Sequence, residues 1–124
     1  MIVVSLVLNI VVLVPVTVSI LRAAGWVESA FGARTPARDI LLSVYIAILA
    51  VSCALLAAML SLPDSLWVVA AAGALLIVQV VYKLLTPISV RRGVRNPVVA
   101  SNLAIAAVHV LTLAATLPTI LAGR

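Results

Sequence analysis

The sequence has few charged residues, and this scarcity argues against a soluble globular domain. Only 9% of its 124 residues are Asp, Glu, Lys or Arg, whereas 66% are hydrophobic. A soluble domain carries roughly 25% charged residues, which help to cover its surface. Because the mean hydropathy is also high, at +1.40, the chain is predicted to be an integral membrane protein.

Residue types that carry catalysis or bind metals are equally scarce. The chain has one cysteine, one histidine and three acidic residues. One His and one Cys cannot form a multi-residue His/Cys metal site, and the three acids are too dispersed for a carboxylate pair. Cys53 has no second cysteine for an intrachain disulfide. No glycine-rich phosphate loop or nucleophile motif is present. We therefore predict no enzymatic activity, no catalytic or metal-binding residues and no cofactor.

Long apolar runs are what the sequence does contain. Four of them approach or exceed the roughly 17–25 residues that a helix needs to cross the hydrocarbon core. None alternates as a strand of a membrane barrel does. The predicted fold is all-α: an antiparallel four-helix transmembrane bundle, a single domain over residues 1–124, with spans at about 2–21, 40–62, 65–86 and 97–122. The first run lacks a basic leader and exceeds a signal-peptide core, so we expect a retained span.

The basic residues predict the orientation of this bundle. Four spans place the first and third loops on one side of the membrane. That side carries seven of the eight basic residues, namely Arg22, Arg34, Arg38, Lys83, Arg91, Arg92 and Arg95, and the other carries Arg124. Lys and Arg are held on the cytoplasmic face. We therefore expect basic cytoplasmic loops, both termini outside, and a bacterial cytoplasmic (inner) membrane.

The same basic residues indicate lipid rather than nucleic acid as a partner. They are few and lie in two short loops, which is a poor footprint for nucleic acid. Anionic headgroups attract such loops. Lys83 lies near the inner end of span three, where its stem is expected to extend to the interface. The candidate headgroup contacts are Lys83, Arg91, Arg92 and Arg95.

Two segments carry more local predictions. The first loop, RAAGWVESAFGARTPARD, is compatible with a short interfacial helix anchored by Trp26 and Phe31, and equally with an irregular loop. Thr35–Pro36 and Asn96–Pro97 resemble helix starts, with an N-cap followed by proline at the first helical position.

Small residues predict where the helices pack. Span two carries a row of them at alternating spacings of four and three: Ser43, Ala47, Ala50, Ala54, Ala57 and Ser61. Small faces let helices approach closely in lipid, so we expect this face to be the main packing seam. The run AAAGA at 70–74 in span three is a second place for close approach.

Polar side chains within the spans form the candidate site. Unpaired polar groups in hydrocarbon cost several kcal/mol, so these side chains must face protein or water. Counting residues from the inner ends of the spans places Asn9, Ser52 or Cys53, and His109 at one depth, where we expect them to meet. Gln79 is expected to bond to a neighbouring helix. The full candidate cluster is Asn9, Ser52, Gln79, Asn102, His109, Thr112 and Thr116.

The role of this cluster has two interpretations. In the first, its hydrogen bonds stabilise the contacts between helices, at about 0.6 kcal/mol per bond. In the second, it contains a proton-sensing or proton-carrying histidine. We predict a small multi-pass inner-membrane protein that acts as a non-enzymatic accessory or interaction subunit, with a membrane-protein partner or as a homo-oligomer. The alternative is a small oligomeric transporter or channel with a polar path along Asn102, His109 and Thr116. A third option is a subunit of a lipid-modifying enzyme that holds phosphate headgroups with Arg91, Arg92 and Arg95.

Overall fold

The described part of the chain is helical. A computed structural model describes residues 1–90 and 93–122, and it contains no strand within them. The elements are α1 (Ile2–Leu21), α2 (Gly25–Phe31), α3 (Pro36–Ser61), α4 (Leu66–Ser89), the short 3-10 helix η1 (Gly93–Arg95) and α5 (Pro97–Leu121). The four long helices, α1, α3, α4 and α5, are each long and apolar enough to cross a membrane.

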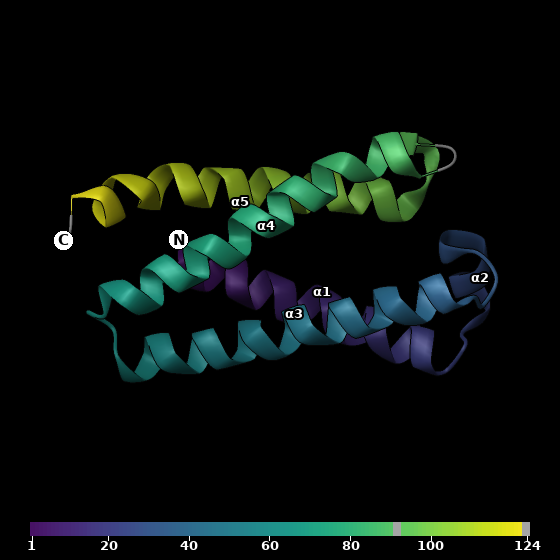
Figure 1. The fold of residues 1–124 in the computed structure, drawn as a ribbon, viewed down its shortest axis with the longest axis horizontal. Coiled ribbons are helices and arrows are strands. Elements are labelled where there is room, and N and C mark those ends of the chain that lie inside the picture. The colour runs from purple at the N-terminus through teal and green to yellow at the C-terminus, as the bar shows by residue number, and fades with distance from the viewer. Residues whose placement is uncertain (91–92, 123–124) are drawn as a thin grey trace.

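The four long helices run alternately up and down. In Figure 1, the start of α1, the α3–α4 turn and the end of α5 lie toward one end of the molecule, and α2 and η1 lie at the other. The closest pairings are α1 with α3 and α4 with α5. Helix α4 starts beside the end of α3 and crosses diagonally to the start of α5 (Figure 1). The two pairs are therefore joined by the oblique α4, with α2 closing one end.

Side-chain caps fix where two of the long helices begin. The hydroxyl of Thr35 accepts a hydrogen bond from the backbone N–H of Arg38, and the side chain of Asn96 accepts one from Val98 at 2.9 Å. Both caps precede a proline, which has no N–H to leave unpaired at the first helical position. The structure confirms both predicted helix starts. Helix α3 accordingly begins at Pro36, four residues before the apolar run itself.

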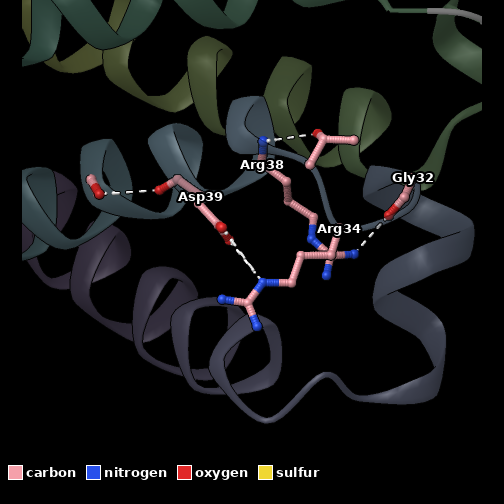
Figure 2. A network of polar contacts seen from close by, with 6 residues as sticks. Gly32, Arg34, Arg38 and Asp39 are labelled. Carbon is pink, nitrogen blue, oxygen red and sulfur yellow. Dashed lines mark hydrogen bonds and ion pairs between the residues drawn. The ribbon is translucent and has the colours of Figure 1, made fainter.

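Polar contacts secure the turn between α2 and α3 (Figure 2). Gly32 ends α2 with φ +85°, a left-handed conformation that favours glycine. Its carbonyl accepts a 2.7 Å hydrogen bond from Nη1 of Arg38, which is buried. Arg34 also pairs with Asp39 at 3.3 Å, but both side chains are well exposed, so this ion pair contributes little. The buried Arg38 contact therefore matters more for the turn.

Helix α2 resolves the first loop in favour of a short helix. Its Val27 is 1% exposed and packs into a cluster with Leu13, Ile20, Tyr45 and Ile48. Trp26 stays half exposed on the outer side of the same helix. The helix is thus anchored to the bundle through Val27.

The molecule is apolar outside, and its interior combines apolar clusters with many polar side chains, unlike a soluble protein. Large apolar side chains are exposed along all four long helices, for example Val11, Leu60, Trp67 and Leu111. The interior holds Ser5, Asn9, Thr17, Ser52, Gln79, Lys83, Asn102, His109 and Thr112, all buried. Lipid accommodates this arrangement because exposed apolar groups suit hydrocarbon and polar groups there must face protein. The four apolar helices thus suggest a small integral membrane protein.

The small residues of α3 do not form the packing seam inside the chain, and that prediction was wrong. We call their row the small face of α3: Ser43, Ala47, Ala50, Ala54, Ala57 and Ser61. All six of its side chains are exposed. The opposite face packs inward through Tyr45, Ile48 and Ser52. Tyr45 and Ile48 make more van der Waals contact with α1 than alanines would, and Ser52 bonds to Asn9 of α1, which together outweigh closer backbone approach.

The small run of α4 does serve close packing. Ala72 is fully buried against Ile2 and Leu6 of α1. Gly73 is also buried, and a Cβ atom built on it would lie 3.4 Å from Cδ1 of Ile120 in α5. The structure thus confirms close approach for these two residues of the run.

Candidate functional site

A hydrogen-bond network surrounds the single histidine in the centre of the bundle. His109 of α5 is completely buried. Its Nδ1 lies 3.1 Å from Oγ of Ser5, and its Nε2 lies 3.0 Å from Oδ1 of Asn9, both on α1. The network extends to α3, since Nδ2 of Asn9 donates to Oγ of Ser52 at 3.3 Å. It closes within α5, where Oγ1 of Thr112 lies 2.9 Å from Oγ of Ser5. We call these five residues the His109 network.

One tautomer of a neutral imidazole satisfies every bond of the His109 network. Asn9 uses its N–H group on Ser52, so its oxygen accepts from His109 and the proton lies on Nε2. Nδ1 then accepts from the hydroxyl of Ser5, which in turn accepts from Thr112. The donors therefore point one way from Thr112 to Ser52. A network satisfied in this way stabilises helix contacts without an external ligand.

The structure brings together some of the predicted cluster and separates the rest. Asn9, Ser52 and His109 meet as depth counting suggested, and Thr112 joins them. Cys53, the alternative to Ser52, is exposed on α3. Sequence reasoning missed Ser5. The available signal was its spacing of four residues before Asn9, which places both side chains on one helical face.

The polar stripe of α5 does not act as one unit. The hydroxyl of Thr116 donates to the carbonyl of Thr112 in its own helix at 2.7 Å. Asn102 contacts Lys83 of α4 instead of the His109 network. Asn102 and His109 are seven residues apart, or about 10 Å along a helix. The residues of the proposed polar path thus have three separate sets of partners.

Gln79 differs from what the sequence predicted. Its side chain is completely buried, yet neither amide atom has a hydrogen-bond partner among the described residues. The expected bond to a neighbouring helix is therefore absent from that part of the chain. At the corresponding depth α5 presents Ala106, which is buried and has no polar side chain to offer. An unsatisfied buried amide costs about 1–3 kcal/mol.

A second polar group lies closer to the α2 end, around Lys83. This residue is only 3% exposed. Its Nζ donates to the hydroxyl of Tyr82 at 2.7 Å and to Oδ1 of Asn102 at 3.4 Å, and it lies 4.7 Å from the centroid of the Tyr82 ring. The ammonium group thus points into the bundle rather than out to a headgroup. The expectation of an outward-extending lysine was wrong because Asn102 and Tyr82 offer it oxygen acceptors inside.

A cavity of about 210 Å³ adjoins the Lys83 ammonium group. Its walls come from α1, α2, α3, α4 and α5, and most are apolar or aromatic: Val12, Leu13, Val16, Trp26, Phe31, Tyr45, Tyr82, Val98 and Ile105. Lys83, Asn102 and Ser101 supply the polar side of the wall. We call this the Lys83 cavity. Tyr45 and Phe31 pack edge to face beside it, with ring centroids 6.3 Å apart.

A neighbouring cavity lies on the other side of the same aromatic wall. It also measures about 210 Å³ and shares Phe31, Tyr45, Tyr82 and Asn102 with the Lys83 cavity. Leu41 and Thr86 line it in addition, so it lies toward α3 and α4. The bundle is therefore loosely packed between its two helix pairs at the α2 end.

The remaining predicted headgroup contacts lie around η1. Arg95 is exposed at the end of η1, at the same end of the molecule as α2. Arg91 and Arg92 lie outside the described residues. Contact of these arginines with lipid headgroups stays a prediction.

Among the described residues, no three His, Cys, Asp or Glu side chains gather in the way that a metal site needs. Cys53 stands alone on the exposed side of α3. The candidate functional groups of residues are thus the His109 network and the residues that line the Lys83 cavity.

Comparison of the chain with protein-family models, curated proteins and solved structures finds no match.

Proposed function

We propose that the chain is a non-enzymatic accessory subunit of a bacterial inner membrane, which binds a partner membrane protein through the small face of α3. In this proposal both termini lie outside and α2 and η1 lie on the cytoplasmic side. The orientation rests on the basic residues, since Arg22, Arg34, Arg38 and Arg95 all lie at the α2 end of the described chain.

The exposed small face of α3 is the observation that supports this proposal most. It extends over Ser43–Ser61, about 27 Å at 1.5 Å per residue, which is nearly the thickness of the hydrocarbon core. Contact with lipid chains does not favour a row of alanines and serines, because larger apolar side chains would contact lipid equally well. A second helix does gain, because small residues allow its backbone to approach closely.

The satisfied His109 network supports a structural interior rather than a transport path. All five of its side chains bond to one another across α1, α3 and α5. The two cavities around the aromatic wall are lined by none of these five residues. The transporter alternative needs polar groups that exchange partners with a passing solute. Asn102 alone of its three path residues lines a cavity.

Co-purification tests the proposal. The tagged chain is extracted from its native membranes in a mild detergent, and the mass and composition of the complex are determined. We expect a foreign membrane protein in stoichiometric amount. The double substitution Ala50→Ile and Ala54→Ile adds bulk to the small face and is expected to release that partner. A matched control makes the same change at the exposed Ala71 and Ala74 of α4 and is expected to retain it.

Each alternative has its own outcome in this experiment. A homo-oligomer without a foreign partner would favour the transporter alternative. A partner that survives bulk on α3 but not on α4 would place the interface elsewhere. A monomer carrying lipid alone would contradict the accessory role.

A further inference from the structure

The charge of Lys83 has no counter-charge within the described chain. The only ion pair there joins Arg34 to Asp39, both largely exposed. The three acidic residues of the sequence are Glu28, Asp39 and Asp64. Glu28 and Asp64 are exposed, the first on α2 and the second in the turn at the opposite end of the bundle. Burying an ammonium group is costly unless an opposite charge compensates it. Because the described chain supplies no such charge, an anionic ligand bound beside Lys83 would lower this cost.

The groups around the ammonium leave bonding capacity for an anion. Nζ of Lys83 has three N–H donors and uses two of them, on Tyr82 and Asn102. Tyr82 accepts from Lys83, so its own hydroxyl proton is free to be donated. Asn102 accepts through Oδ1, and its amide nitrogen has no hydrogen bond among the described residues. Three donors thus converge beside the Lys83 cavity.

The rest of the Lys83 cavity selects an apolar ligand body. Val12, Leu13, Val16 and Ile105 line one side, and the aromatic rings of α2, α3 and α4 line the other. A water-soluble anion would leave these walls without contact. The cavity reaches the surface, because Trp26, Pro97 and Ser101 of its lining are exposed. At about 210 Å³, it is smaller than the roughly 300–1,000 Å³ of a site that encloses a drug-sized ligand.

We propose that the Lys83 cavity binds an anionic amphiphile of the bilayer, with a carboxylate or phosphate group on Lys83. The first carbons of the acyl chain lie between α1 and α5, and the remainder extends into lipid. The limited volume suits this division, because only the polar group and the start of the chain need to enter.

The depth of the site matches a ligand from the adjacent leaflet. Lys83 lies six residues before the end of α4, about 9 Å at 1.5 Å per residue. Asn102 lies five residues after the start of α5, at a similar depth. Trp26, half exposed on α2 at the same end of the bundle, is the kind of residue that anchors at the headgroup level. A carboxylate or phosphate group therefore reaches Lys83 without crossing the hydrocarbon core.

The chain offers a built-in reporter for this site. It has two tryptophans. Trp26 lines the Lys83 cavity, and Trp67 lies at the far end of the bundle, 86% exposed. The Trp67→Phe variant isolates the fluorescence of Trp26, and Trp26→Phe isolates that of Trp67. The protein is placed in phosphatidylcholine nanodiscs and titrated with a stearic acid that carries a nitroxide quencher near its carboxyl end. Its neutral methyl ester serves as the matched probe without charge.

We expect the acid to quench Trp26 saturably, at about tenfold lower concentration than the ester, because only the carboxylate forms a charge-assisted hydrogen bond with Lys83; tenfold corresponds to about 1.4 kcal/mol. Trp67 reports partition into the bilayer alone, so acid and ester should quench it equally. Unlabelled oleate and dioleoyl phosphatidic acid should relieve the quenching of Trp26. Equal quenching of Trp26 by acid and ester would overturn the proposal. Relief by inorganic phosphate or acetate at the same concentrations would also overturn it, because the site would then be one for small anions.

Substitution of Lys83 supplies the second arm. Lys83→Met keeps the length of the stem and removes the charge, and it should abolish the difference between acid and ester. Arg95→Gln removes an exposed charge at the same end of the molecule and should leave that difference intact. Circular dichroism checks that both variants are folded. A folded Lys83→Met protein that still prefers the acid tenfold would refute the assignment, and if the variant does not fold, the comparison of acid with ester in the wild-type background decides. This experiment involves no partner protein, so its failure leaves the accessory role untouched.

Discussion

The hydrogen bond between Asn9 and His109 should make the effects of substitutions at these two residues on the stability of the bundle non-additive. Asn9→Leu removes two hydrogen bonds, to His109 and to Ser52. His109→Leu also removes two, to Ser5 and to Asn9. The double variant removes three, because the Asn9–His109 bond is common to both. The sum of the losses in unfolding free energy of the two single variants should therefore exceed the loss of the double variant. The difference is the free energy of the shared bond, about 0.6 kcal/mol on average and at most about 1.7 kcal/mol.

Equilibrium unfolding in mixed micelles of a mild detergent and dodecyl sulfate measures this coupling. A control cycle combines His109→Leu with Thr17→Val. The Thr17 hydroxyl is buried, but within the described residues it bonds only to carbonyls of its own helix, those of Leu13 and Val14. Thr17 lies eight residues from Asn9, about 12 Å along α1, so the control should be additive within roughly 0.3–0.5 kcal/mol. A coupling between Asn9 and His109 no larger than that of the control would show that their bond does not join α1 to α5.

Three other predictions concern individual residues. Gln79→Leu should raise the free energy of unfolding by about 1–3 kcal/mol, because it removes a buried amide without partners; destabilisation in the same micelle assay would mean that the amide has one. Asn96→Ala should lower stability by about 1–2 kcal/mol, since it removes both the α5 cap and a 3.0 Å hydrogen bond to the carbonyl of Ala30 in α2; an unchanged unfolding midpoint would contradict this. In a Cys53→Ser background, Pro63→Cys should react with an impermeant maleimide on intact cells and Ala33→Cys only after lysis; the reverse pattern would overturn the proposed orientation.

Sequence alone was sufficient for the long helices because their signals are local. Apolar runs of spanning length and the pairs Thr35–Pro36 and Asn96–Pro97 require no knowledge of neighbours. Helix α2 is different. Its seven residues carry no clear apolar period, and only Val27 is buried, against α1 and α3. Whether this segment is helical therefore depended on contacts that no local pattern encodes.

Depth along the helices could be predicted, but the direction of side chains could not. Counting residues placed Asn9, Ser52 and His109 at one level, where the structure joins them. The same count applied to Lys83 and Asn102 would have found their contact, yet the length of the lysine stem favoured an outward path. An inward acceptor at the same depth decides between the two directions. Polar residues on facing helices thus need to be compared at every depth, including the helix ends.

The small face of α3 shows the opposite limit. Its spacing identified a surface for close helix packing, but a pattern on one helix does not say which helix packs there. Inside the chain, α1 packs against Tyr45, Ile48 and Ser52 on the other face. A row of small residues left exposed beside a completed internal seam is expected when a second protein supplies the missing helix.

His109 and Lys83, two buried basic side chains, differ in what they still require. His109 is neutral in the tautomer that its neighbours dictate, and Ser5 and Asn9 satisfy both ring nitrogens. Lys83 has oxygen acceptors but no carboxylate near it in the described chain, and it lies beside an open cavity. Hydrogen bonds alone compensate a neutral group fully, whereas an ammonium group also needs an opposite charge. The histidine therefore has its partners within the chain, whereas the counter-charge of the lysine is what the proposed anionic ligand would supply.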